Sequence, residues 1–211
     1  MRIDILNLGG SIRIPTSVEV AYSTACLLKD NGRLILIDPG DYLSLHALER
    51  SFEERGIALE DVTDILLTHL HLDHAYATRM FPNATIYIHS AYKNKPYDKF
   101  GLIKSKLYKE ILSSWKDVVE IKAGDVLFDK IKVFHTPWHA KEHSSFLIET
   151  ENMGNVLYTG DIVMNRVEFY DIIRWLRKDD CARFVNKIGA MCDYIIFTHD
   201  DYVKVSDYFR R

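Results

Sequence analysis

Short apolar, β-branched runs alternate with helix-like patterns along most of the chain. Such runs predict strands, because β-branched side chains fit a pleated and buried surface. They occupy residues 3–8, 18–28, 34–37, 65–67, 86–88, 131–134, 146–148, 156–158 and 194–197. Asn31-Gly32 is typical of a tight hairpin turn, and the polar segment 151–155 predicts a longer turn. Both turns indicate antiparallel pairs of strands.

Apolar residues at helical spacing predict helical segments between these strands, over residues 43–52, 102–115 and 169–188. The first segment is expected to end near Gly56, because glycine readily supplies the C-terminal cap of a helix. Strands that alternate with helices are typical of layered α/β folds. The chain is therefore predicted to form an α/β sandwich.

The composition fits one compact unit, and we expect a single domain over residues 1–211. Hydrophobic residues make up 47% of the chain, charged residues make up 27%, and the formal net charge is −3. This weak and mixed charge argues against a nucleic-acid partner. Cys26, Cys181 and Cys192 are widely spaced and form no Cys-x-x-Cys pair. They predict buried apolar residues rather than disulfides or thiolate metal ligands.

The start of the chain carries an acid at Asp4 and no long apolar run follows, so we expect no signal peptide. No segment reaches the roughly 18–20 uninterrupted apolar residues that span a bilayer. A cytoplasmic protein without a membrane partner is therefore expected. The apolar side chains Tyr202, Val203, Tyr208 and Phe209 are expected to dock on the body or on a second subunit, which leaves a homodimer open.

Two segments, residues 64–69 and 193–199, share one pattern: an acid, three or four apolar residues, and then Thr-His. Each predicts a buried strand that delivers a histidine from its C-terminal end. Two such strands, one in each half of the chain, would direct His69 and His199 toward a common cleft between halves of similar build.

The segment 68–74 reads Thr-His-Leu-His-Leu-Asp-His and is the most informative stretch of the chain. His69 and His71 alternate with leucines, so both imidazoles can face the same side. Asp73 and His74 follow and can serve a second ion. So many desolvated polar groups in one place are costly unless a metal compensates them. Imidazole and carboxylate ligands suit zinc, with iron, manganese or cobalt as alternatives.

This cluster resembles the His-x-His-x-Asp-His signature of the metallo-β-lactamase superfamily. That family has three further ligands, and the matching contexts follow here in the same order. They are Thr-Pro-Trp-His at residues 136–139, Tyr-Thr-Gly-Asp at 158–161 and Phe-Thr-His-Asp at 197–200. The resemblance runs from about residue 21 to residue 199, and it implies a four-layer αβ/βα sandwich.

The resemblance also implies a dinuclear metal site. Its ligands would be His69, His71 and His139 for one ion, Asp73, His74 and His199 for the other, and Asp161 as the carboxylate that bridges both. Asp38, in the Asp-Pro-Gly turn at residues 38–40, resembles the acid of the family's Asp-Thr-Gly turn and would orient a ligating imidazole from behind. His135 and His143 flank the ligand between them and are expected to be structural or pocket residues.

Two ions a few ångströms apart can share a hydroxide, lower its pKa and polarise the oxygen of the bond that is cut. The resemblance therefore implies a metal-dependent hydrolase with Asp161 and Asp73 as catalytic residues, Asp73 returning a proton to the leaving group. The segments around the ligands look most like the N-acyl-homoserine lactonases, which implies a small-molecule lactone or ester as substrate. Met164 stands where those lactonases have a tyrosine and Trp138 where glycine is usual, so another ester or lactone is also considered.

Two other reactions stay open for the same ligands. A glyoxalase II-like thioester hydrolase needs only a different pocket, and a mono-iron sulfur dioxygenase of the superfamily uses a subset of these residues. The lysine-rich segment 92–115 is interpreted either as an amphipathic flap over the cleft or as a helix packed on the sandwich with a solvated basic face. Loop length and pocket shape choose the substrate in this fold, so fold-level analogy leaves it undecided.

Overall fold

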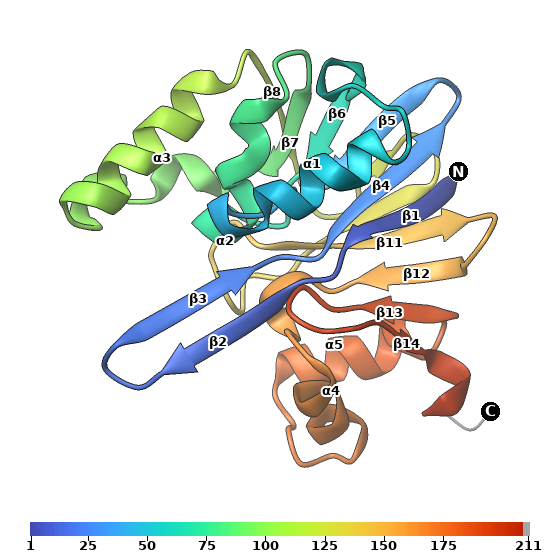
Figure 1. The fold of residues 1–211 in the computed structure, drawn as a ribbon. Coiled ribbons are helices and arrows are strands. Elements are labelled where there is room, and N and C mark those ends of the chain that lie inside the picture. The colour runs from blue at the N-terminus through green and yellow to red at the C-terminus, as the bar shows by residue number, and fades with distance from the viewer. Residues whose placement is uncertain (209–211) are drawn as a thin grey trace.

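Two six-stranded sheets form the inner layers of the molecule in the computed structural model, which describes residues 1–208 (Figure 1). The first sheet has the order β1 (Arg2–Asn7), β4 (Ala25–Asp30), β5 (Arg33–Ile37), β6 (Asp64–Leu66), β7 (Thr85–His89) and β8 (Asp117–Ile121). The second has the order β14 (Val203–Lys204), β13 (Tyr194–Ile196), β12 (Gly154–Tyr158), β11 (Ser144–Thr150), β10 (Ile131–His135) and β9 (Val126–Leu127). A separate ribbon, β2 (Gly10–Ile14) paired with β3 (Val18–Tyr22), extends away from the sheets.

Helices cover the outer face of each sheet. On the first sheet lie α1 (Leu45–Glu53) and α3 (Leu102–Ser114), and on the second lie α4 (Arg166–Ile173) and α5 (Asp180–Gly189). Short helical turns connect the larger elements: η1 (Tyr42–Ser44), η2 (Leu59–Asp61), α2 (Leu72–Ala75), η3 (Tyr76–Met80), η4 (Ser90–Asn94), η5 (Tyr97–Lys99), η6 (Gly160–Ile162) and η7 (Val205–Asp207).

Apolar side chains fill the three spaces between these four layers. Phe52 of α1 belongs to the core between the first sheet and its helices, and Phe146 to the core between the two sheets. Phe169 of α4 belongs to the core beneath the second pair of helices. Each side chain of this kind contributes on the order of 1.5–3 kcal/mol when it is buried. The αβ/βα sandwich that the sequence predicted is confirmed.

Parallel pairing brings the carboxyl ends of several strands to one edge of the sandwich. The strands from β5 to β8 pair in parallel, and so do β12 and β13. Ile37 pairs with Leu66 and Tyr158 pairs with Ile196, so the chain segments that follow these residues leave the sheets side by side. Segments at the carboxyl ends of parallel strands commonly bind ligands.

Two predicted segments are each divided in the structure. The run 18–28 forms β3 and β4, because the N–H of Thr24 between them donates to the carbonyl of Thr198 instead of continuing one strand. The single helical segment expected over 169–188 is wrong. Its chain leaves α4 at Trp175, where φ is 59°, and a new helix begins where the side chain of Asp179 caps α5.

Other local predictions hold. β4 and β5 are antiparallel and joined at Asn31-Gly32, where φ is 46° and 78°. The longer turn joins β11 and β12. The lysine-rich α3 packs on the first sheet through Tyr108 and Ile111, which supports the packed-helix interpretation for that part of the segment.

The cysteines and the end of the chain also behave as expected. All three cysteines are buried and free. Val203 is buried in β14, and the ring of Tyr208 lies 5.4 Å from that of Phe169, so this part of the chain docks on the body. Phe209 lies outside the described residues. Within residues 1–208 the structure contains no helix with the length and apolar character needed to cross a bilayer.

Candidate metal centre

The seven residues predicted as metal ligands meet at the edge where the carboxyl ends of the parallel strands lie. They belong to the segments that follow β6, β10, β12 and β13: His69, His71, Asp73, His74, His139, Asp161 and His199. Their ligand atoms form two groups, and within each group all the atoms lie within 4.8 Å of one another.

The first group contains three imidazoles and one carboxylate. Nδ1 of His71 lies 2.9 Å from Nε2 of His69 and 3.0 Å from Nε2 of His139. Oδ2 of Asp161 lies 3.4 Å from Nε2 of His139 and 3.8 Å from Nε2 of His69. Four nitrogen and oxygen atoms therefore face one another, which is the donor set of a tetrahedral zinc site.

The second group contains two imidazoles and two carboxylates. Oδ1 of Asp161 lies 3.2 Å from Nε2 of His74 and 3.4 Å from Nε2 of His199. Oδ2 of Asp73 lies 3.6 Å and 3.5 Å from the same two nitrogens. The two oxygens of Asp161 thus face different groups, as a bridging carboxylate requires.

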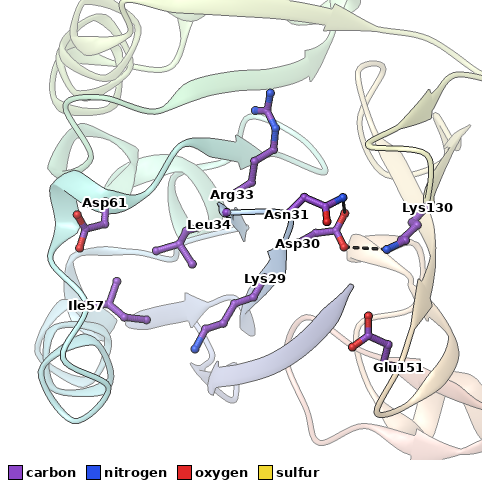
Figure 2. A pocket seen from close by; sticks show the side chains of 10 residues that line it. Lys29, Asp30, Asn31, Arg33, Leu34, Ile57, Asp61, Lys130 and Glu151 are labelled. Atoms are coloured by element: carbon purple, nitrogen blue, oxygen red, sulfur yellow. Dashed lines mark hydrogen bonds and ion pairs between the residues drawn. The ribbon is translucent and has the colours of Figure 1, made fainter.

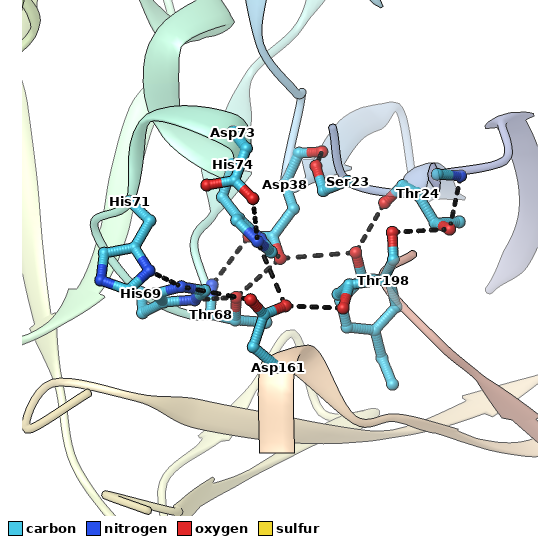
Figure 3. A network of polar contacts seen from close by, with 12 residues as sticks. Ser23, Thr24, Asp38, Thr68, His69, His71, Asp73, His74, Asp161 and Thr198 are labelled. Carbon is cyan, nitrogen blue, oxygen red and sulfur yellow. Dashed lines mark hydrogen bonds and ion pairs between the residues drawn. The ribbon is translucent and has the colours of Figure 1, made fainter. Parts of the chain in front are cut away.

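Asp38 supports the second group from behind (Figure 3). Its carboxylate is fully buried, and Oδ2 lies 2.9 Å from Nδ1 of His74. The backbone N–H and the hydroxyl of Thr68 donate to its two oxygens at 2.8 Å and 2.7 Å. Because Nδ1 of His74 donates to Asp38, its Nε2 is directed at the shared carboxylate. This is the orienting contact that the Asp-Pro-Gly turn predicted.

The threonines of the two Thr-His pairs hold carboxylates in the same way. The hydroxyl of Thr68 donates to Asp38, and the hydroxyl of Thr198 donates to Oδ1 of Asp161 at 2.6 Å. The sequence interpretation gave neither threonine a role. The signal that could have found them is the repeat itself, since both pairs end a short buried strand.

His143, expected to be a structural or pocket residue, positions the backbone of Asp161. Its buried ring accepts a hydrogen bond from the N–H of Asp161 at 2.9 Å, and its Nδ1 lies 2.8 Å from the hydroxyl of Thr136. Gly160 permits this approach, because its φ is 62° and a Cβ there would overlap Nε2 of His143. A larger residue at this position would displace the shared carboxylate.

Burial and nearby charges decide the protonation of the imidazoles. Burial, followed by the charges of Lys95 and His139, lowers the pKa of His71 to about 2, and burial lowers the pKa of His69 well below its ordinary value. Burial also opposes a charge on His74, but the carboxylates led by Asp161 raise its pKa well above the ordinary value. His69 and His71 are therefore neutral at pH 7, and neutral imidazole is the form that binds a metal.

The residues of the two groups fit a metal ion. Nε2 of His74 is buried and has no hydrogen-bond partner among the described residues, although two carboxylates lie within 4 Å. A buried polar atom without a partner is costly. A cation between these atoms would satisfy Nε2 of His74 and neutralise both carboxylates.

The centre is open on one side. The side chains of Asp73 and His139 are 21% and 26% exposed, whereas those of His69 and His74 are fully buried. A separate groove, with a volume of about 670 Å³, surrounds the β4–β5 turn. Charged residues such as Lys29 and Lys130 line it (Figure 2). That groove adjoins the start of β5, at the far end of the strand from Asp38, and contains none of the predicted ligands.

Three other histidines and Trp138 lie outside the two groups. The rings of His89 and His135 stack on each other with centroids 3.9 Å apart, and His46 is exposed on α1. Trp138 is 43% exposed, and its ring lies 5.7 Å from that of Phe184. None of these side chains supplies an atom to either ligand group.

Comparison with known proteins gives a consistent family match. The protein-family model described as "Metallo-beta-lactamase superfamily" matches residues 18–203. The chain is 46% identical to a candidate metallo-beta-lactamase from Thermotoga maritima of known crystal structure. The match has a TM-score of 0.92 and covers 96% of this chain and 98% of that one.

Curated relatives match over shorter spans. An N-acyl homoserine lactonase from Bacillus sp is 32% identical over 156 residues, which cover 69% of this chain and 58% of the relative. An atrochrysone carboxyl ACP thioesterase from Passalora fulva is 28% identical over 138 residues, which cover 62% of this chain and 34% of the relative. The chain therefore spans about half the length, or less, of the curated relatives that it matches.

Proposed function

Because the chain belongs to the metallo-beta-lactamase superfamily, we propose that it is a dinuclear metal-dependent hydrolase that opens a lactone or cleaves a related ester. The observation that carries the proposal is the position of Asp161, whose two oxygens face two separate groups of potential ligands. A carboxylate in this position can hold two cations at once, and paired cations are a recurring means of hydrolysis in proteins.

We assign the ligands as the family motif predicts. His69, His71 and His139 would hold the first ion, Asp73, His74 and His199 would hold the second, and Asp161 would bridge the two. The nitrogen and oxygen donors of both groups, without a thiolate, support zinc, although iron and manganese accept the same donors. The supporting contacts of Asp38 and His143 fix the rotation of one imidazole and the position of the bridge.

When bound, the two ions supply a water of lowered pKa and polarise the oxygen of the bond that is cut. Asp73 is the proposed proton carrier of the reaction. Its side chain is 21% exposed, so it can reach a substrate, and its Oδ2 lies within 3.6 Å of both imidazoles of its group. It would accept a proton during attack and return it to the leaving oxygen. Asp161 would stay ionised throughout, because His74 and His199 hold its pKa well below the ordinary value in spite of its burial.

A small-molecule lactone is the substrate class that the comparisons favour. The Bacillus relative is named an N-acyl homoserine lactonase, and its match covers more than two thirds of this chain. The exposed sides of Asp73 and His139 face the open side of the centre, where a small ester can approach. A nucleic-acid substrate is not favoured, because the net charge of the chain is −3.

Thioester cleavage is the second candidate, because the Passalora fulva relative is named an ACP thioesterase. The same ligand groups would serve, since a thioester carbonyl is polarised in the same way. The two reactions differ in the leaving group, which is a thiol in one and an alcohol in the other.

The test is hydrolysis by protein purified without chelator and loaded with Zn²⁺. N-acyl-homoserine lactones, aryl esters and acyl thioesters are compared as substrates. His71→Ala and Asp161→Ala are expected to lower kcat/KM more than about 100-fold, since loss of an outer partner alone typically costs 10–100-fold. His46→Ala, an exposed histidine on α1, is the matched control and should leave the rate unchanged. Hydrolysis that survives both ligand substitutions would refute the proposal.

A further inference from the structure

A buried ion pair lies beside the chain segment that carries His69 and His71. Nζ of Lys95 donates to Oε1 of Glu142 at 2.6 Å, and the two side chains are 12% and 2% exposed. Lys95 directly follows η4, the helical turn that comes after β7 of the first sheet, whereas Glu142 lies between β10 and β11 of the second. The pair therefore joins the two halves of the sandwich at the proposed metal centre.

Both members of the pair also bind the backbone of Leu70, the residue between the two histidines. Nζ of Lys95 donates to the carbonyl oxygen of Leu70 at 2.8 Å, and the N–H of Leu70 donates to Oε1 of Glu142 at 3.3 Å. Leu70 is fully buried in the irregular stretch between β6 and α2. Its N–H and carbonyl group need partners there, and the ion pair supplies both.

The same pair fixes the segment that carries His139. Glu142 lies three residues beyond His139 and directly before His143, whose ring holds the N–H of Asp161. The ring nitrogens of His71 and His139, 3.0 Å apart, come from the two segments that the ion pair joins. A shift of either partner would change the spacing of these two nitrogens.

Stability alone is a weak reason for such a pair. Removal of both charges from water is costly, and apolar residues of similar size often stabilise a protein equally well. What an apolar pair cannot do is bind the N–H and the carbonyl of Leu70 together. Resting on the proposed dinuclear function, we propose that Lys95 and Glu142 are positioning residues that set the spacing of His71 and His139 and thereby the metal affinity of the first group.

The test measures Zn²⁺ affinity by competition with a chromophoric chelator on the full chain. Lys95→Met and Glu142→Gln are expected to weaken binding at the first group about 10–100-fold, the usual effect of losing a partner that orients a ligand. Lys93→Met is the matched control. Lys93 lies two residues away and pairs with Glu120, but this pair is exposed, so its loss should leave Zn²⁺ affinity unchanged.

Measurement of Zn²⁺ affinity in two ligand variants shows which of the two ligand groups Lys95→Met weakens. His199→Ala removes a ligand of the second group, and His71→Ala removes one of the first. The weakening caused by Lys95→Met should persist with His199→Ala and disappear with His71→Ala. Equal weakening in both backgrounds, or affinity unchanged in a folded Lys95→Met protein, overturns the inference.

A double variant separates positioning from folding. Lys95→Met leaves the Glu142 carboxylate buried without its cation and can unfold the chain, whereas Lys95→Met with Glu142→Gln removes both charges and keeps an acceptor for Leu70. If this variant melts like the wild type without metal and binds Zn²⁺ weakly at the first group, the inference is supported. Wild-type affinity in the double variant overturns the positioning role and leaves the proposed function standing. A wild-type chain that binds no Zn²⁺ overturns both.

Discussion

Asp38→Asn should weaken both the fold and the second metal group. The carboxylate accepts from the N–H and hydroxyl of Thr68, and its Oδ2 lies 2.9 Å from Nδ1 of His74. Asparagine keeps an oxygen for the backbone N–H but places an amide NH₂ near the other two groups. The hydroxyl of Thr68 can rotate to accept from that amide. The N–H of His74 can only donate, so it is left without an acceptor. One charge-assisted bond is lost and another is weakened, so the free energy of unfolding should fall by about 2–4 kcal/mol.

The effect on metal binding follows from the tautomer of His74. A ring that binds a metal through Nε2 keeps its proton on Nδ1, and in Asp38→Asn this N–H would face the amide NH₂ instead of an acceptor. Zn²⁺ affinity at the second group should therefore fall about 10–100-fold. Urea unfolding without metal measures the first effect, and competition with a chelator measures the second.

Asp64→Asn is the matched control for this prediction. Asp64 is 1% exposed on β6, the strand that leads to His69, and it pairs with Arg33 at the opposite end from the metal centre. Its substitution should lower the stability of the chain while Zn²⁺ affinity stays unchanged. Equal Zn²⁺ affinities for Asp38→Asn and Asp64→Asn would show that the contact with His74 does not orient a ligand.

Three further predictions concern the packing around the centre and in the core. Gly160→Ala should lower the free energy of unfolding by about 1–3 kcal/mol and weaken Zn²⁺ binding, because the new Cβ overlaps His143; unchanged urea and Zn²⁺ titrations would contradict this. Phe146→Ala removes a fully buried ring between the sheets and should cost about 3–5 kcal/mol in urea unfolding while the metal stoichiometry stays the same. Burial raises the pKa of Cys181 and Cys192 to about 12, so thiol reagents at pH 8 should label the chain only after it unfolds, and rapid labelling of the native protein would refute their burial.

Strands that are buried on both faces were among the elements that the sequence predicted. All three residues of β6 are buried, and so are the last three residues of β5 and of β12. Their apolar runs stand out in the sequence. β2 and β8 were not predicted, because nearly all of their side chains are partly or fully exposed and the sequence shows no apolar run there. The break between α4 and α5 coincides with a positive φ at Trp175. The segment between the two helices contains no glycine or proline that would have signalled this break in the sequence.

The candidate site shows the same division. His69, His71, Asp73 and His74 lie in one short motif, so their residue types and spacing already indicated a metal site. His139, Asp161 and His199 were added through the resemblance to the family signature. Lys95 and Glu142 were not singled out, because they are 47 positions apart and share no motif. Their contact exists only after the two sheets have packed. Contacts of this kind depend on tertiary structure and leave no periodic or local trace in the sequence.

The metal content of the chain tests the proposed dinuclear site most directly. Protein dialysed against Zn²⁺ and then freed of excess metal is analysed for bound ions, with Asp161→Ala as the comparison. We expect about two zinc ions per chain for the wild type and fewer for Asp161→Ala, because the carboxylate of Asp161 faces both groups. One ion per wild-type chain, unchanged by Asp161→Ala, would contradict the dinuclear site and favour a mononuclear reaction instead.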